Sequence, residues 1–233
     1  KKMNNSKLIN IKNGEPWMGL IDGVYAIILT LLVIELPALI IELVNMVGEE
    51  ASVFNVLGAI ALNVSGYLFA TILIYDLWSL HKGFEYICKP TRFVSIVSTF
   101  ILWLSSLIPP SVYLVDHFFQ QLALGNKLEA DQISAINLEI IIVRLAEMFI
   151  IALIYFLLFT ILKHSSKQSI DNNEYSREIS ETTKIVYFRL LVSAVLVIIS
   201  CLMPTSFIVP ELPLAILAVF TLIPSDSYGK KYS

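Results

Sequence analysis

A few ionisable side chains stand inside the long apolar runs of this sequence, among them Asp22, Glu35, Asp76, Arg144 and Glu147. A charge within a membrane-spanning helix is costly, and such groups usually face other protein groups or a water-filled path. Arg144 and Glu147 are three residues apart, so they share one helical face and can form an ion pair. A structural ion pair is the simpler interpretation of these two residues, and a role in substrate or proton coupling is the functional alternative. Asp76 is expected near the aqueous boundary, either solvated or paired with Lys82.

A second pattern lies along the apolar run 22–35. At 100° per residue, one stripe of a helix holds a glycine, a threonine and neighbouring aliphatic residues: Gly23, Ile27, Thr30 and Ile34, with Leu31 beside them. Copies of this helix around an axis would place apolar rings above and below a ring of hydroxyls. Apolar rings can gate a pore by dewetting, and hydroxyl oxygens can partly replace ion hydration. Alternatively, Thr30 bonds its own backbone four residues back, and Gly23 permits close helix packing.

The composition places these residues in a membrane protein. Of the 233 residues, 57% are hydrophobic and 15% charged, and the mean hydropathy is +0.77, whereas soluble domains are about 45–50% apolar and about 25% charged. A net charge of −3 gives no electrostatic footprint for nucleic acid. We therefore predict an all-α integral membrane protein with membrane lipid as a partner, no nucleic acid, and no room for a separate soluble enzyme domain.

Six apolar runs are expected to cross the bilayer, which takes about 20 residues per helix. They are residues 17–36, 51–75 with a close near Trp78, 93–115, 138–162, 190–203 and 207–223. Pro37 is expected to end the first run, Pro109 and Pro110 to break the third, and Pro204 to stop the fifth. Residues 38–47 are expected to form a short interfacial helix, and residues 164–184 a solvated connection. The domain organisation is thus a tail 1–16, a six-helix transmembrane domain 17–224 and a tail 225–233.

The basic residues orient these spans, because loops rich in Lys and Arg stay cytoplasmic. Fourteen of the sixteen Lys and Arg residues lie in the two tails and in the connections after the second and fourth spans. The alternate connections hold Lys127 among several acidic residues. Both termini are therefore predicted to be cytoplasmic.

The sequence contains no motif typical of an enzyme active site or a metal site. It has no Gly-rich phosphate loop, no nucleophile motif and no paired histidines at metal-ligand spacing, and its histidines, His81, His117 and His164, are expected on separate loops. No enzyme activity, metal site or cofactor is expected. The Thr-Val-Gly-Tyr-Gly filter of known potassium channels is also missing. No re-entrant filter loop is therefore expected, and any ion selectivity must come from helix side chains.

The runs 22–27 (DGVYAI) and 30–35 (TLLVIE) resemble the first span of the transmembrane protein 175 family of potassium channels. In that family an Arg-x-x-x-Phe-Ser-Asp signature precedes a similar run. Trp78 and His81, followed by Phe84 and Ile87, resemble the close of the family's second span, and residues 107–111 resemble the outer end of its third. The chain departs from the signature, because Pro16, Leu20 and Ile21 replace its Arg, Phe and Ser. This departure is expected to affect packing or opening of the first span and not the stripe.

The resemblance implies a homotetramer with K⁺ as the permeant ion, in a multi-pass arrangement expected in the bacterial plasma membrane. It implies that Ile27, Leu31 and Ile34 form the pore constriction and that Thr30 contributes to selectivity. It also implies that Asp22 is a structural anchor near Trp78 and His81. Glu35 is expected at the outer mouth, where an acidic ring could gather cations, although an ordinary interfacial carboxylate is an equal alternative.

Three functions remain open at this point. The first is a passive, potassium-preferring cation channel. The second is a small secondary transporter or solute permease that uses the Arg144/Glu147 pair, although the prolines lie at span ends and not midway, which weakens this interpretation. The third is a nonconducting membrane scaffold, which the eroded signature permits.

Overall fold

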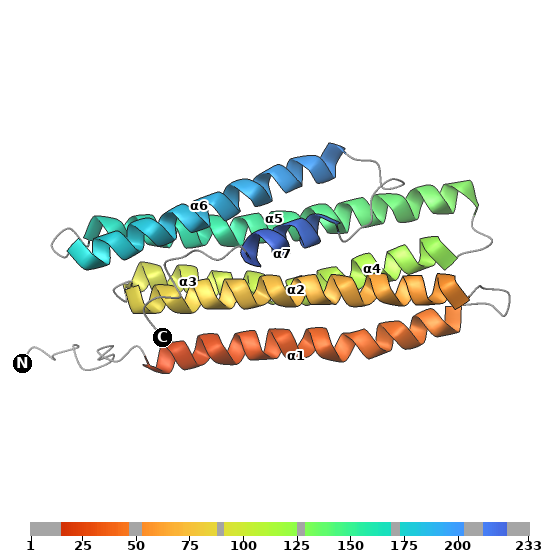
Figure 1. Ribbon diagram of the computed structural model, residues 1–233, viewed down its shortest axis with the longest axis horizontal. Helices are drawn as coiled ribbons and strands as arrows, with labels where there is room; N and C mark the ends of the chain where they lie inside the picture. The colour runs from red at the N-terminus through yellow and green to blue at the C-terminus, as the bar shows by residue number, and fades with distance from the viewer. Residues whose placement is uncertain are drawn as a thin grey trace, which may run out of the picture.

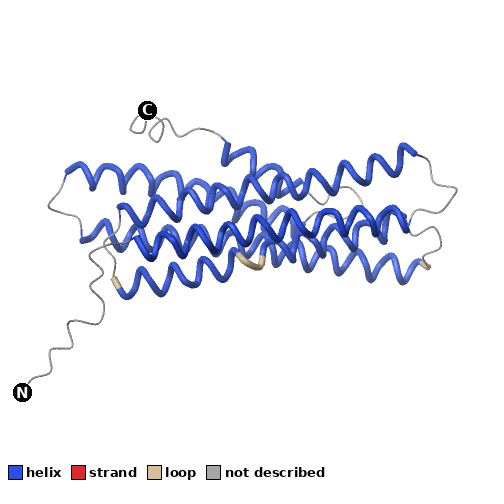
Figure 2. Tube along the Cα trace, turned by 90° about the horizontal axis from the view of Figure 1, so that it is seen from below, coloured by secondary structure: helices blue, strands red, loops and turns tan. Residues whose placement is uncertain are grey.

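The computed structural model describes residues 15–46, 53–87, 91–124, 129–168, 173–202 and 212–222. Within these ranges every residue except Thr91, Ser106, Leu107 and Glu129 is helical, and no strand occurs. The helices lie along one long axis and successive crossings alternate in direction (Figure 1). The all-α class expected from the composition is confirmed, and Figure 2 shows the same helices from below.

Helix α1, Glu15–Met46, lies at one edge of the bundle (Figure 1). It continues through Pro37, so the expected end of the first span at this proline is wrong, and the expected interfacial helix 38–47 is the outer part of α1. A proline removes one backbone hydrogen bond, but membrane helices tolerate this loss where neighbouring groups satisfy the freed carbonyl. Leu39 and Leu43 are fully buried, so packing beyond the proline holds the helix together.

Helix α2, Val53–Ile87, packs antiparallel to α1. It does not close near Trp78 but extends more than two turns further, so His81 and Lys82 lie on the helix and not on a loop. The expected beginning of this span at residue 51 lies outside the described residues.

The third crossing is divided into α3, Arg92–Ser105, and α4, Ile108–Leu124. The helix breaks at Ser106 and Leu107, just before the proline pair (tan segment near the centre of Figure 2). Pro109 and Pro110 occupy the first turn of α4, where a missing N–H costs little. The prolines therefore start the second helix, and α4 runs nine residues beyond the predicted end of the span.

Helix α5, Ala130–Gln168, contains the predicted fourth span, and helix α6, Asn173–Leu202, contains most of the predicted fifth. Of the polar stretch 164–184, which is expected to form a solvated connection, residues 164–168 and 173–184 are helical and belong to α5 and α6, and residues 169–172 lie outside the described residues. Helix α7, Leu212–Leu222, begins inside the predicted sixth span. All three histidines lie on helices, contrary to expectation.

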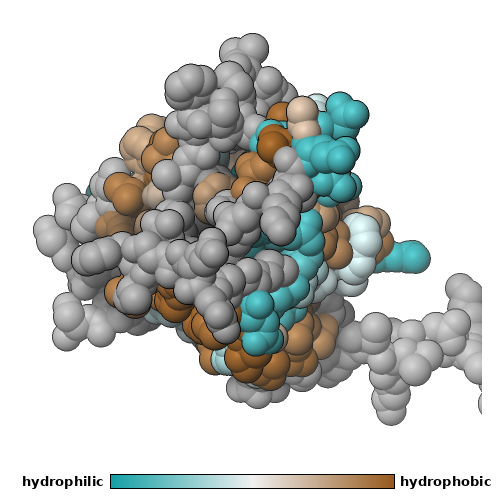
Figure 3. Space-filling model, turned by 90° about the vertical axis from the view of Figure 1, so that its right-hand side faces the viewer, coloured by the Kyte–Doolittle hydropathy of each residue, from teal (hydrophilic) through white to brown (hydrophobic). Residues whose placement is uncertain are grey.

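Within the part of the chain that the structure describes, five helical segments are long and apolar enough to cross a membrane: Gly19–Asn45, Val56–Phe84, Arg92–Leu122, Ala130–Ser166 and Ile179–Ile199. At a rise of 1.5 Å per residue, even 21 residues span about 30 Å, the thickness of a bilayer core. Helix α7 has 11 described residues, which reach about half that depth. Seen end-on in Figure 3, hydrophobic side chains surround much of the bundle, and hydrophilic ones gather on one side.

Candidate functional site

The two faces of α1 differ sharply. One face is buried against the bundle through Ile21, Tyr25, Ile28 and Leu32, which follow helical spacing. The opposite face is open, and it carries the stripe expected from the sequence: Gly23, Ile27, Thr30, Leu31 and Ile34 are all exposed. Ile27 and Ile34 are 62% and 63% exposed. The stripe therefore lies on the outside of a single chain, where lipid or another copy can reach it.

The hydroxyl of Thr30 donates to the backbone oxygen of Ala26 at 2.7 Å. A bond of this kind, from a threonine to its own backbone four residues back, is the alternative that the sequence offers to an ion-facing role. This bond uses the hydroxyl proton of Thr30 but leaves the lone pairs of the oxygen available. The oxygen can therefore still accept a hydrogen bond or contact a cation. Gly23 has open space around its Cβ position, since no side chain of the same chain lies within 4 Å of it.

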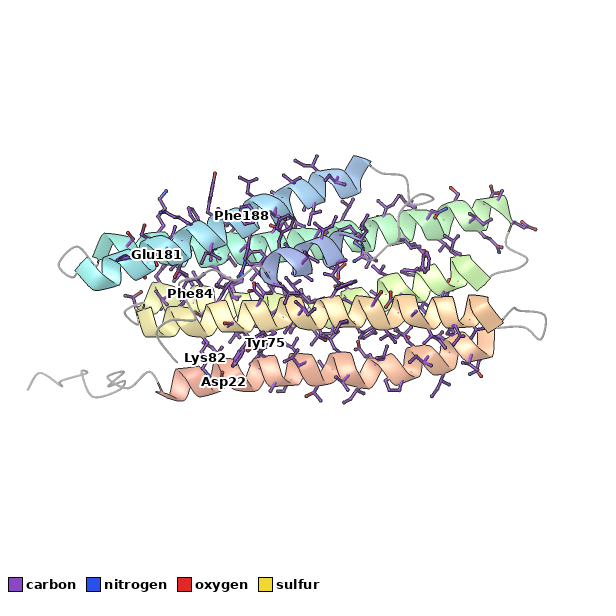
Figure 4. All side chains as sticks on the ribbon, in the orientation of Figure 1. Asp22, Tyr75, Lys82, Phe84, Glu181 and Phe188 are labelled. Carbon is purple, nitrogen blue, oxygen red and sulfur yellow. The ribbon has the colours of Figure 1, made fainter. Side chains whose placement is uncertain are left out.

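Asp22 joins α1 to α2 at the N-terminal end of the stripe. Its carboxylate accepts a hydrogen bond from Trp78 Nε1 at 2.8 Å and pairs with Lys82 Nζ at 2.9 Å. Figure 4 shows Asp22 and Lys82 facing each other across the two helices. The lysine also lies over the Trp78 ring, 5.0 Å from its centroid. The contact expected between Asp22 and Trp78 is present, and the lysine, which the sequence analysis assigned to a loop, completes it.

His81 does not contact Asp22. It is fully buried, and its Nδ1 lies 3.5 Å from the hydroxyl of Tyr25, whose ring it meets edge-on. The same hydroxyl lies 3.3 Å from Oγ of Ser105, the last residue of α3. Among the described residues, Nε2 of His81 has no hydrogen-bond partner. Tyr25, His81 and Ser105, here called the Tyr25 cluster, thus connect three helices behind the stripe.

The outer half of α1 contacts α4. His117 Nδ1 lies 3.2 Å from Glu42 Oε1, and its Nε2 lies 2.9 Å from Gln121 Nε2. The ring of His117 stacks on Tyr113, with the ring centroids 5.9 Å apart. Glu35 is partly buried, and among the described residues its Oε2 has no hydrogen-bond partner.

Arg144 and Glu147 form the ion pair that their spacing predicts, on the buried face of α5. They are only 5% and 0% exposed within the single chain. The geometry matches a structural pair inside the subunit. No cluster of three or more His, Cys, Asp or Glu side chains suited to a metal ion occurs in the part of the chain that the structure describes.

A network that the sequence analysis missed centres on Asp76. Its carboxylate pairs with Arg189 Nη1 at 2.6 Å and accepts a hydrogen bond from the Tyr155 hydroxyl at 3.1 Å. Arg189 also donates to the backbone oxygen of Thr221 at 3.4 Å. Asp76 therefore pairs with Arg189 and not with Lys82, and the network joins α2, α5, α6 and α7. The available signal was Arg189 itself, a charge directly before an apolar run that was counted as part of a loop.

Comparison with known proteins bears on the helices that carry the stripe. Residues 18–109 match the family model described as TMEM175, endosomal/lysosomal potassium channel TMEM175. This match covers most of α1 together with α2 and α3, and ends at the proline pair. The resemblance seen in the first span is therefore confirmed over these residues. No curated protein and no solved structure matches the chain.

Proposed function

We propose, starting from the similarity of residues 18–109 to a family of potassium channels, that this protein is a potassium-preferring cation channel. Four copies would surround one axis, with α1 of each copy lining the pore. Ile27, Leu31 and Ile34 would form the constriction, and Thr30 would contribute to selectivity. K⁺ is the permeant ion and no cofactor is needed. The single-repeat organisation of the family's prokaryotic members agrees with a bacterial plasma membrane.

One observation carries this proposal: the stripe residues are exposed while the opposite face of α1 is sealed against its own bundle. A pore inside one chain would need polar or ion-facing residues on the buried side. That side of α1 instead presents Ile21, Ile28 and Leu32, each at most 1% exposed. The stripe can therefore line a path only where several chains meet.

The stripe also suggests how the path would close. Aliphatic side chains that meet at an axis exclude hydrated ions, because dewetting removes the water that carries them. Conduction would require the rings of Ile27, Leu31 and Ile34 to dilate or turn. Glu35 follows the last of these rings, so four copies would add negative charge near the outer mouth.

The test is ion flux in vesicles that contain the purified protein. A K⁺ gradient alone should drive flux, and replacing Ile27→Asn or Leu31→Asn should raise it at least severalfold, because an amide hydrates the constriction. Val33→Asn is the matched control, since Val33 is exposed on the same helix but lies about 100° from the stripe. Unchanged flux in both stripe variants would contradict a pore-lining α1, and strict dependence on a proton gradient would favour a transporter.

A further inference from the structure

We infer that the hydroxyl of Tyr25 sets the rotation of α1 about its own axis and thereby holds the stripe in its non-conducting direction. The consequence for gating rests on the proposed channel function, whereas the effect on helix rotation does not. Tyr25 is a positioning residue in this scheme, because it contacts neither the path nor the ion.

The place of Tyr25 on α1 supports this role. At 100° per residue, Tyr25 lies 160° from Ile27 and 180° from Ile34, so it is on the side of the helix opposite the constriction. When α1 rotates about its own axis, the stripe and the Tyr25 hydroxyl turn through the same angle. Because they lie on opposite sides of the helix, they move in opposite directions. A rotation of about 20° moves a group some 8 Å from the helix axis by about 3 Å, enough to break a hydrogen bond.

The partners of the hydroxyl come from two other helices and are themselves fixed. Ser105 and His81 are both 0% exposed, one at the end of α3 and the other on α2. If the Tyr25 hydroxyl moves away, Nδ1 of His81 loses this neighbour, and Nε2 already lacks a hydrogen-bond partner among the described residues. A buried polar group without a partner is costly, so the cluster opposes rotation. Asp22 holds α1 to α2 only, and the hydroxyl of Tyr25 adds the connection to α3.

Both contacts of the hydroxyl are long, at 3.3 and 3.5 Å, so their loss should shift an equilibrium without unfolding the protein. Tyr25→Phe removes the oxygen alone and keeps the buried ring. We expect it to raise the open probability of single channels about two- to fivefold, the effect of roughly one weak hydrogen bond. Single-channel conductance and the preference for K⁺ should stay unchanged, because the stripe is intact. A change in packing alone would not be expected to raise the open probability while leaving the conductance and the preference for K⁺ unchanged.

Two further variants test the assignment. Ser105→Ala should raise open probability in the same direction but less, since the His81 contact remains, and adding it to Tyr25→Phe should have no further effect. Tyr187→Phe is the matched control: it removes an exposed hydroxyl on α6 and keeps the ring contact with Phe159. An unchanged or lower open probability in Tyr25→Phe, or an equal rise in Tyr187→Phe, would overturn the inference.

A second measurement does not depend on conduction. Spin labels at Ala26→Cys on α1 and Ile198→Cys on α6, in a chain with Cys88 and Cys201 replaced by Ser and diluted with unlabelled chain, report one distance within a subunit. Tyr25→Phe should shift or broaden this distance, and Tyr187→Phe should not. If the vesicles carry no K⁺ flux, the channel proposal fails, and the distance still decides the role of Tyr25. An unchanged distance would refute it.

Discussion

Arg189 shows how much a single side chain can contribute inside this bundle. The Arg189 side chain is 8% exposed, and it forms an ion pair with the carboxylate of Asp76, whose side chain is 12% exposed. Burial of two charges is costly, so such a pair adds little net stability, but removal of one partner leaves the other charge buried alone. The hydroxyl of Tyr155 and the backbone oxygen of Thr221 complete the surroundings of the pair. At this scale the network acts as a clamp between helices.

The variant Arg189→Met should therefore destabilise the protein strongly. Leaving Asp76 without its cation is expected to cost about 3–5 kcal/mol, seen as a lower unfolding temperature in detergent. The double variant Asp76→Asn/Arg189→Met should recover much of that loss, because no charge stays buried. The control is Arg177→Met, which breaks an exposed pair with Glu181 and should change stability by less than about 1 kcal/mol. Equal losses for the two arginines would show that the Asp76 network is not a clamp.

At the scale of the element, α1 is the helix with two different surroundings. Its inner face packs on α2, α3 and α4, and its outer face carries the stripe. A structural helix at the edge of a bundle would also show an apolar outer face toward lipid. If the stripe faces other copies of α1, a small group added to the outer face would meet a neighbouring chain. If the stripe faces lipid, the same group would meet only lipid.

Gly23 allows these possibilities to be separated. A Cβ at Gly23 or at Gly58 meets nothing within 4 Å in the single chain, so Gly23→Ala and Gly58→Ala should each leave the subunit fold intact, with up to about 1 kcal/mol gained from helix propensity. If copies of α1 meet along the stripe, Gly23→Ala should also weaken the assembly, whereas Gly58→Ala should not. The share of assembled protein on size-exclusion chromatography reports the difference. Identical profiles for the two variants would place the stripe toward lipid.

At the scale of the whole molecule, the described helices of one chain pack into a single bundle, and the stripe lies outside its core. Buried apolar residues from each of the described helices, α1 to α7, belong to one continuous cluster. The buried Arg144/Glu147 pair lies inside the same bundle, which argues against its use as an accessible transport site. If the protein conducts along the stripe, the path would therefore form between chains and not within one.

The number of subunits is the corresponding prediction. Native mass spectrometry of the purified protein should give a particle of four times the 26.2 kDa chain, after the mass of bound detergent is removed. Four-fold symmetry brings four stripes to one axis, whereas a monomer leaves each stripe in lipid. A stable monomer or dimer that still conducts K⁺ would contradict a pore made by four copies of α1.

Hydropathy alone predicted the membrane class and most of the helices, because the free energy of insertion depends on summed side-chain transfer and not on partners. Helical spacing predicted the Arg144/Glu147 pair and the stripe, because it is a local property of the sequence. The exact helix ends were harder, and Pro37 is an example, since packing of Leu39 and Leu43 beyond the proline overrides its local preference.

The tertiary structure decided which distant side chains meet. Asp76 had Lys82 within reach along the sequence, yet it pairs with Arg189, 113 residues away, because α2 and α6 bring these two groups to the same depth. Likewise, His81 faces Tyr25 and Ser105 and not Asp22. Helical periodicity determines which residues share a face, but the rotation and depth of each helix depend on all its neighbours together. For that reason the stripe and the contact of Asp22 with Trp78 could be predicted from the sequence, whereas the contacts of Tyr25 and of Asp76 could not.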